Sequence, residues 1–462
     1  MVLMSRLNPI KNMEVHYVHG RTTQQSRCAH LSATFTPSHG SLSHGPLFSV
    51  FGKERERRWT LPRLIYQAIL MAYDPSAYLK DRFANARQCL VEMFPNQRRP
   101  GKTYQGFVKA LCKIPSGFRE ELQLHLCRHL EKVAGQSWKL FGWIPFAVDG
   151  SRIEVPRTQV NQEAPGCAGK EKTGPQFLLT LLYHMGSALP WRWEIGRDLD
   201  SERNHLREML KHLPLGSLLV ADAGFTGFEL FKEMARTHLS FLIRVGASVT
   251  LLTHLGFEVE RQGDIVWLWP GTQRKQAPLP LRLIRLKVKT KWSRDRQAMY
   301  LLTNVFDHER LPDEVAGKFY QMRWGVELFY RSFKRTLDQH KLRSHAPQQA
   351  EEELHWALTA MLLLGLMSVD ALASVQRDPC QLSVAEALRT VRHAMLTNDR
   401  WRYRGDLRKR LAQALKDDYQ RRSSKKARDW PHKKKESPPG PPKIRPAKPN
   451  EIARAKRSYK VA

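Results

Sequence analysis

Three acidic residues are placed so that together they could carry metal-assisted chemistry. Asp149 lies in the segment AVDGS and Asp222 in VADAGF, and small residues follow both at once, which leaves room for a ligand. Glu327 lies far downstream in a segment with helical periodicity. Each aspartate alone also fits ordinary turn chemistry. Three converging carboxylates would concentrate negative charge, and oxygen ligands of this kind favour Mg²⁺ or Mn²⁺.

The segment from Tyr320 to Arg343 is predicted to form a helix with a polar edge beside an apolar face. It contains no proline and one glycine, and its residues favour a helix. The apolar face consists of Phe319, Met322, Val326, Phe329, Phe333 and Leu337. Beside it, within an arc of about 60°, lie Tyr320, Arg323, Glu327 and Lys334. Taken alone, the segment is equally compatible with a solvated helix carrying i,i+4 ion pairs.

The elements that must position these residues alternate between strands and helices. The strand candidates are IPFAVDGSRIEV, QFLLTLLYHMG, SLLVADAGF and LSFLIRV, and the helix candidates are SERNHLREMLKHL and FELFKEMART. The alternation predicts an α/β fold with a mixed sheet, with Asp149 and Asp222 at or just beyond strand ends. From about residue 246 to 303 only strand-like runs occur, so we expect a β-rich insertion there.

These segments resemble the DDE transposases of the bacterial insertion-sequence-4 (IS4) family. The resemblance rests on AVDGS, on VADAGF and on the pattern Y-x2-R-x3-E-x6-K. The flanking runs MYLLTN, SERNHLREML and FLIRV also occupy the places expected in that family, and the resemblance covers about residues 140–370. It implies a ribonuclease-H-like catalytic core at residues 142–375, interrupted by the β-rich insertion.

The resemblance also implies roles for the individual side chains. Asp149, Asp222 and Glu327 would be catalytic and would hold two Mg²⁺ ions, with Mn²⁺ as a substitute, for two-metal phosphoryl transfer. Tyr320, Arg323 and Lys334 would bind DNA phosphates at the transposon end. The implied reaction is hydrolytic nicking followed by strand transfer into target DNA. Asp338 shares the helix edge, but the spacing of the signature selects Glu327.

Two other functions remain open at this stage. One is a catalytically inactive, transposase-derived DNA-binding protein, and the other is a nuclease of the same fold without strand transfer. The intact acidic triad favours the active transposase over the first, and the Tyr/Arg/Lys pattern favours it over the second. Trp267, Trp269 and Trp292 of the insertion fit base stacking or ordinary strand packing. Arg244 fits a DNA contact or an ion pair.

The composition indicates the partners. The 462-residue chain has a formal net charge of +32 and a pI near 10.2, which favours a polyanion, because phosphates neutralised by Lys or Arg release counterions. We expect double-stranded DNA, as inverted-repeat transposon ends and as target, and an anionic membrane surface is the weaker alternative. By family analogy a homodimer would form when two ends are paired. Six cysteines without a C-x-x-C pair favour reduced thiols in a cytosolic setting. The family resemblance implies a bacterial cytoplasmic protein that associates with the nucleoid when bound to DNA.

The remaining segments complete the expected domain organisation. Residues 1–57 predict a poorly ordered leader, and residues 58–141 predict a helical domain that either contacts DNA or is a purely structural bundle. The apolar run Trp356 to Ala373 is interpreted as a buried helix rather than a membrane span. C-terminal helices are expected at residues 376–420. Residues 421–462 contain 15 Lys/Arg against three Asp/Glu, with seven prolines, and predict a disordered polybasic tail.

Overall fold

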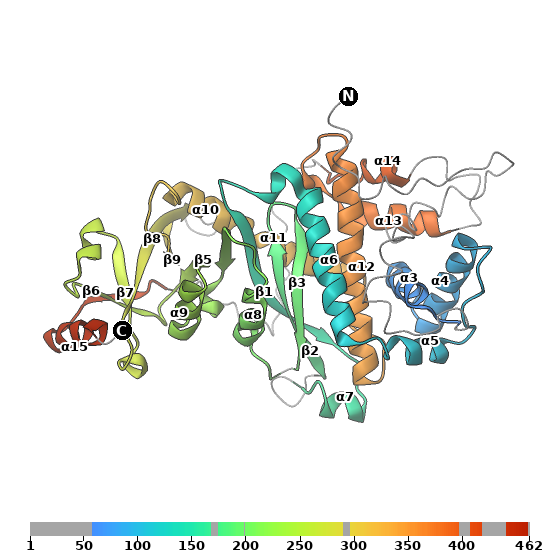
Figure 1. Ribbon diagram of the computed structural model, residues 1–462, viewed down its shortest axis with the longest axis horizontal. Helices are drawn as coiled ribbons and strands as arrows, with labels where there is room; N and C mark the ends of the chain where they lie inside the picture. The colour runs from blue at the N-terminus through green and yellow to red at the C-terminus, as the bar shows by residue number, and fades with distance from the viewer. Residues whose placement is uncertain are drawn as a thin grey trace.

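The computed structural model describes residues 58–167, 174–197, 199–289, 296–396, 407–417 and 440–460. The leader expected at residues 1–57 lies outside these ranges. The described part of the molecule is elongated (Figure 1). The N-terminal helices lie at one end, the strands of the insertion lie at the other, and the central part of the sheet lies between them.

In the described part of the chain, four α-helices precede the sheet, where the apolar spacing predicts helices. They are α3 (Leu61–Tyr73), α4 (Leu79–Met93), α5 (Tyr104–Leu111) and α6 (Ser116–Ala134). Helix α3 is buried on nearly every side because it packs against α4 and against the long helix α12 (Pro347–Ala373). Helix α6 runs alongside α12 (Figure 1). The N-terminal helices therefore share one hydrophobic core with the rest of the chain.

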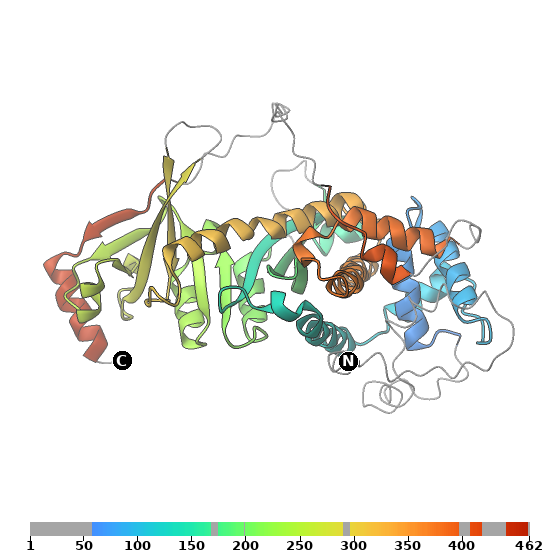
Figure 2. The same cartoon turned by 90° about the horizontal axis from the view of Figure 1, so that it is seen from above.

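Among the described residues, ten strands form one mixed sheet in the order β10-β6-β7-β8-β9-β5-β4-β1-β2-β3. Their bounds are β1 (Ile144–Glu154), β2 (Gln176–His184), β3 (Leu189–Gly196), β4 (Ser217–Ala221), β5 (Ser240–Val245), β6 (Thr250–Thr253), β7 (Ile265–Leu268), β8 (Leu279–Lys289), β9 (Arg296–Thr303) and β10 (Lys443–Pro446). The central strands are continuously apolar because helices cover both faces. Figure 2 shows α10 (Asp313–Met322) and α11 (Trp324–Arg331) along one face, with α8 (Glu202–Leu210) and α9 (Phe228–Arg236) on the other.

The first five strands form the core of this sheet in the order 3-2-1-4-5. Strands β1, β2 and β3 pair antiparallel, whereas β4 runs parallel to β1 and β5 runs parallel to β4. Helix α9 supplies the crossover that two parallel neighbours require. This order and these directions are those of a ribonuclease-H-like core, as predicted from the sequence.

Strand β1 corrects one expectation about the site. The sequence places Asp149 at or just beyond the end of a strand, with a second extended run after it. The structure has a single strand from Ile144 to Glu154, with Asp149 in its middle. The strand continues because β2 pairs with it from Phe146 to Glu154, with Asp149 opposite Leu181 and Gly150 opposite Thr180.

The predicted β-rich insertion is present as strands β6 to β9. It is continuous with the core, because β9 pairs antiparallel with β5 and β8 pairs antiparallel with β9. Trp267 and Trp269 are buried in it, and their indole nitrogens donate to Glu260 Oε1 at 2.6 Å and to the Gln276 carbonyl at 2.8 Å. Strand packing therefore accounts for both residues. Trp292 lies outside the described residues.

The prediction of a disordered tail at residues 421–462 is wrong for residues 440–460, which form a strand and a helix. Strand β10 pairs parallel with β6 and adds to the edge of the insertion, and α15 (Pro449–Lys460) follows it. Glu451 forms ion pairs of 2.8 Å with Arg274 of the insertion and with Arg445 of β10. The averaged charge of the tail does not reveal this short segment, because a sheet edge distant in sequence supplies its hydrogen bonds. Residues 421–439 lie outside the described residues.

The helix expected from Tyr320 to Arg343 is shifted toward the N-terminus. It begins at Asp313 as α10, continues as α11, and closes in a π-helical turn, η6 (Ser332–Thr336). Asp338 follows with a left-handed backbone (φ 60°), and its carboxylate pairs with Arg343. The helix ends there because the chain turns into the loop that leads to α12. The remaining helices are α7 (Gln159–Glu163), α13 (Val384–Met395) and α14 (Leu407–Leu411).

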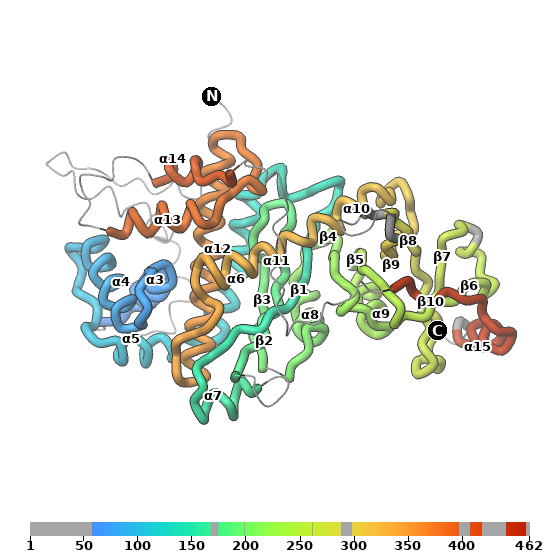
Figure 3. Tube along the Cα trace, turned by 180° about the vertical axis from the view of Figure 1, so that it is seen from behind, coloured from blue at the N-terminus to red at the C-terminus, as the bar shows by residue number. Residues whose placement is uncertain are grey.

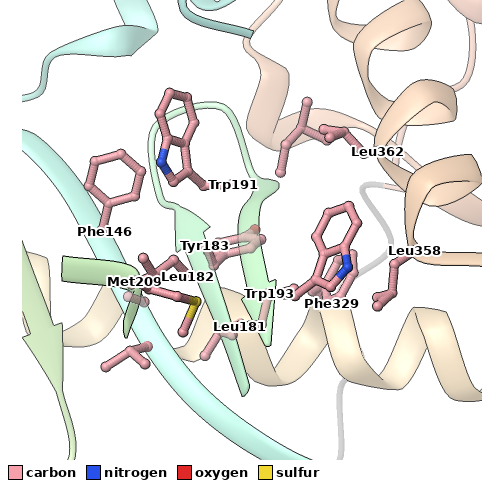
Figure 4. Close-up of a cluster of buried hydrophobic side chains, with 14 of the residues drawn as sticks. Phe146, Leu181, Leu182, Tyr183, Trp191, Trp193, Met209, Phe329, Leu358 and Leu362 are labelled. Carbon is pink, nitrogen blue, oxygen red and sulfur yellow. The ribbon is translucent and has the colours of Figure 1, made fainter. Parts of the chain in front are cut away.

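A buried aromatic cluster fixes α11 and α12 over the sheet (Figure 4). The sheet contributes Tyr183, Trp191 and Trp193, and the helices contribute Phe329 of α11 and Leu358 and Leu362 of α12. Each such side chain contributes about 1.5–3 kcal/mol on burial. Helix α12 is the one described helix that is long and apolar enough to cross a membrane. In its most apolar stretch of 18 residues, 83% is buried inside the protein. The expectation of a buried helix is therefore confirmed.

Candidate active site

The two aspartates lie near each other, Asp149 on β1 and Asp222 directly after the parallel strand β4. The β1–β4 register pairs Ala147 with Val220, and its continuation by two residues places Asp149 beside Asp222. Strand β4 ends at Ala221, so Asp222 begins the loop while β1 runs on. The Asp222 carboxylate accepts the N–H of Gly224 at 2.9 Å, which fixes the turn. Beyond the end of β4, the edge of β1 that faced it no longer has a strand partner, and this begins near Asp149.

The environment of Asp149 disfavours its charged form. Partial burial raises the pKa of Asp149 to about 7, and the negative charges of Asp222 and Glu202 act in the same direction. The Arg323 guanidinium opposes this shift. A carboxyl with such a pKa is half-protonated near neutral pH until a cation replaces the proton. The positive charge of Arg323 therefore does not offset the burial of Asp149 and the negative charges around it.

Helix α11 crosses the sheet next to these residues, as the view from behind shows (Figure 3). The Tyr330 hydroxyl lies 2.9 Å from the carbonyl oxygen of Asp149 and 3.1 Å from that of Leu179, so α11 is tied to β1 and β2. Gly325 allows the close approach, because a Cβ there would lie 2.8 Å from the Tyr183 ring. These contacts hold the helix that carries the signature residues next to Asp149.

Arg323 and Glu327 form an ion pair on this helix. Arg323 Nη2 donates to Glu327 Oε1 at 2.8 Å, and both side chains are largely shielded from water. Arg323 also acts on Asp149, as noted above, and its guanidinium lies 5.6 Å from the centre of the Tyr320 ring. The structure thus connects Glu327 to Asp149 through a shared guanidinium.

Tyr320 and Lys334 occupy the two ends of the polar edge. Burial raises the pKa of Tyr320, against the opposing charges of Arg323 and Arg244. Arg244 of β5 is therefore part of this cluster, next to the tyrosine hydroxyl. Lys334 Nζ donates to the carbonyl of Arg152 on β1 at 2.9 Å, and burial lowers the pKa of Lys334. All four signature residues consequently lie along the same stretch of sheet.

Glu202 is a residue that sequence reasoning missed. It opens α8, whose N-cap Ser201 accepts the N–H of Arg203. The Glu202 carboxylate lies against Gly150, where an added Cβ would be 2.1 Å from Oε1. Burial raises the pKa of Glu202, and the charge of Asp222 adds to this. The available signal was an acidic residue directly after a helix N-cap in the block before VADAGF, but no sequence pattern places that block beside Gly150.

The donor set fits a hard divalent cation, although the geometry is not that of a closed metal site. In the described part of the chain, no three His, Cys, Asp or Glu side chains are grouped so that they could hold a metal ion. Asp149 and Asp222 are adjacent, and Glu327 is engaged by Arg323. Carboxylate oxygens are the ligands that Mg²⁺ prefers, and a bound cation would stabilise the charged form of Asp149, whose pKa burial raises. Asp338 lies in the loop beyond the helix and pairs with Arg343, so it takes no part in this cluster.

Known proteins match the part of the chain that contains these residues. Residues 144–363 match the family model described as the transposase DDE domain, and this range contains all of the predicted site residues. Over these residues the chain is similar to transposase DDE domains. Its relatives include the transposase InsG for insertion sequence element IS4 of Escherichia coli (strain K12), which is 26% identical over 266 residues. The match covers 54% of this chain and 58% of that protein, which makes the two distant homologues.

A solved structure also matches over much of the chain. It is the cryo-EM structure of the piggyBac transposase synaptic complex with hairpin DNA, and the match covers 86% of this chain and 82% of that one. The TM-score is 0.38 and the sequence identity is 13%. A similarity this low carries no conclusion about this chain. The fold assignment above rests instead on strand order and direction.

Proposed function

We propose that this chain is a DNA transposase that binds transposon ends and catalyses metal-dependent strand cleavage and strand transfer. The single observation that carries the proposal is the alignment of Asp149 beside Asp222 at the end of β4. The helix that carries Arg323, Glu327 and Lys334 lies across them. The distant homology to the IS4 transposase supports the same function.

Asp149, Asp222 and Glu327 are proposed to hold two Mg²⁺ ions, with Mn²⁺ as a substitute. When bound, such ions activate the attacking oxygen and stabilise the leaving oxygen of an in-line phosphoryl transfer. The chain's own part is to place the two aspartates near each other and to free Glu327 from Arg323. An arriving phosphate supplies the alternative partner for the guanidinium, because Arg binds phosphate in a bidentate manner.

The DNA contacts are assigned to the polar edge of the helix. Tyr320 lies next to Arg244 of β5, Lys334 contacts β1, and Arg323 acts on Asp149, so a scissile phosphate at Asp149 would lie within reach of them. The formal net charge of +32 supports binding to double-stranded DNA, both as inverted-repeat ends and as target. We further propose that two copies pair two ends, and that the protein acts in the bacterial cytoplasm.

One observation favours a second candidate function, a DNA-binding protein without catalysis. Glu327 is engaged by Arg323, and the described residues hold no ready metal site. If DNA does not displace this ion pair, the chain would bind transposon ends without cutting them. The two candidates differ in whether Glu327 is needed for cleavage.

The test is a cleavage assay on a supercoiled plasmid that carries the inverted repeats flanking the gene, with Mg²⁺. We expect the wild type to nick and join DNA, and Glu327→Gln to bind the ends without cutting, because the amide keeps the shape and loses the charge. Glu314→Gln makes the same change at an exposed position of α10 and should cut normally. Binding without cutting by the wild type would support the non-catalytic candidate. Cutting without joining would indicate a nuclease.

A further inference from the structure

A groove of about 760 Å³ separates the N-terminal helices from the loop that follows the catalytic helix. Tyr78 and Lys80, at the start of α4, line one side, and residues 340–345 line the other. Pro156, two residues beyond the end of β1, also lines it. The groove lies outside the carboxylate cluster, and none of the site residues discussed above lines it.

The walls of the groove are firmly joined. Arg343 Nε donates to the carbonyl of Ala77 at 2.9 Å, which ties the loop to the segment before α4. The Asp338 carboxylate pairs with Arg343 and lies 3.9 Å from the buried guanidinium of Arg82. Because the contacts involve main-chain carbonyls and a buried cation, we expect the groove to persist in solution.

The lining of the groove suits a nucleic-acid strand. Lys80 and Lys341 are exposed, and the imidazoles of His340 and His345 are exposed beside them. The exposed carboxylate of Asp81 lines the groove, and that of Asp338 lies 3.2 Å from His340 Nδ1 at its edge. The cations Lys80, Lys341 and Arg343 outnumber these two carboxylates, so the groove is positive in balance. The Tyr78 side chain is 74% exposed, which is unusual for a large ring and leaves its face open to a stacking partner. Cations interleaved with an exposed aromatic ring are what single strands and phosphate backbones bind.

The groove is continuous with the candidate active site along β1. Lys334 contacts Arg152, the Leu342 N–H donates to the Glu154 carbonyl at 2.8 Å, and Pro156 then reaches the groove. Seven residues of extended chain from Asp149 span about 23 Å. Phosphates follow one another every 3.4 Å or so along one strand of a duplex. The groove is therefore about six or seven nucleotides from a phosphate held at Asp149.

We propose that this groove binds the phosphate backbone of the DNA that extends from the carboxylate site, with Tyr78 against a base or sugar. The proposal rests on the proposed function, because it takes Asp149 as the place of the scissile phosphate. It assigns the segment Ala77–Asp81 and the loop 340–345 a joint DNA-binding role, in addition to their packing. Charge complementarity selects DNA as the occupant.

The test compares Lys80→Ala, Lys341→Ala, their combination and Tyr78→Ala with a matched control, Lys409→Ala. Lys409 is exposed on α14, which an ion pair between Arg408 and Asp370 holds near the C-terminal end of α12. The loop 340–345 precedes the other end of this 27-residue helix, about 40 Å away. Thermal unfolding of every variant checks that the full-length chain remains folded.

The measurement is fluorescence anisotropy over a range of salt concentrations. The probes are a duplex of arbitrary sequence and the same duplex with a single-stranded extension. Each lysine removed from the groove should lower the slope of log K against log salt by about one, and the double variant by about two. Tyr78→Ala should weaken binding at least about fivefold, the low end for one base–aromatic stack. A loss confined to the extended probe would assign Tyr78 to an unpaired base, and an equal loss on both probes would assign it to the backbone.

The outcomes separate the two proposals. If the wild type binds neither probe, the proposed function fails. If the wild type binds but the groove variants retain the affinity and salt slope of Lys409→Ala, the groove proposal alone is overturned. If Lys409→Ala loses as much slope as the groove variants, the DNA contact is diffuse and the groove is likewise not its site.

Discussion

Arg323 binds the carboxylate of Glu327 one turn away at 2.8 Å, so the residue expected to hold metal and the residue expected to hold phosphate neutralise each other. The same guanidinium opposes the raised pKa of Asp149. The guanidinium thus supplies the positive charge that a metal ion would otherwise supply to Glu327 and Asp149. The first prediction follows from this arrangement.

Replacing Arg323 with Gln should strengthen metal binding by the DNA-free protein and weaken DNA binding. Loss of the guanidinium removes a competing cation and leaves Glu327 and Asp149 with more negative surroundings. We expect at least about fivefold tighter Mn²⁺ binding by titration calorimetry, because a unit charge at about 4 Å contributes about 1 kcal/mol in bulk water and more at the lower effective dielectric of a partly buried site. Arg331→Gln, on the exposed side of the same helix, is the control. Weaker Mn²⁺ binding by Arg323→Gln would refute this explanation.

The stability of the metal-free protein should fall as pH rises from about 4 to above 7. Asp149 has a pKa of about 7 in the folded chain, against an ordinary value of 3.8. Between these values the folded state retains a proton that the unfolded state has lost, so raising the pH favours unfolding. Asp149→Asn should remove this part of the pH dependence.

Urea unfolding in the presence of a chelator, at several pH values, measures this effect. Excess Mg²⁺ should stabilise the protein most at the high end of the range, because the ion replaces the proton on Asp149. A pH dependence that is the same in the wild type and in Asp149→Asn would show that another group is responsible.

Gly150→Ala should damage the site through Glu202. The added Cβ would lie 2.1 Å from Glu202 Oε1, so the carboxylate or the strand must move. We expect a loss of about 1–3 kcal/mol in unfolding free energy, typical of an overpacked position. The double variant Gly150→Ala with Glu202→Ala should recover most of it, and a double-mutant cycle measures the coupling. Additive losses would mean that the clash is not with Glu202.

Glu451→Ala should loosen the C-terminal strand from the insertion. The substitution removes the ion pairs with Arg274 and Arg445 and leaves two cations without their shared partner. Because these groups are partly exposed, we expect a loss of about 1 kcal/mol or less in global stability. Limited proteolysis should nevertheless cut earlier near residues 440–460, since β10 is an edge strand that pairs only with β6 among the described strands. Arg454→Ala, at an exposed position of α15, should leave the proteolysis rate unchanged.

Much of this architecture could be predicted from local sequence patterns. The apolar runs around Asp149 and Asp222 specify strands, and the stripe through Phe329 and Phe333 specifies a helix with Glu327 on its edge. Both patterns reflect the side-chain periodicity of short segments, which depends on neighbours a few residues away. The order of strands and helices, the β-rich insertion and the order of the acidic blocks therefore follow from the sequence.

The tertiary structure alone decided which distant groups meet. Register brings Asp149 beside Asp222, packing places Glu202 against Gly150, and a free sheet edge captures the strand that begins at Lys443. Contacts of this kind join segments tens or hundreds of residues apart, so no periodicity within one segment encodes them. The sequence by itself determined which side chains have the chemistry to bind a metal ion or DNA. The fold determined that the Arg323 guanidinium pairs with Glu327 and also acts on Asp149.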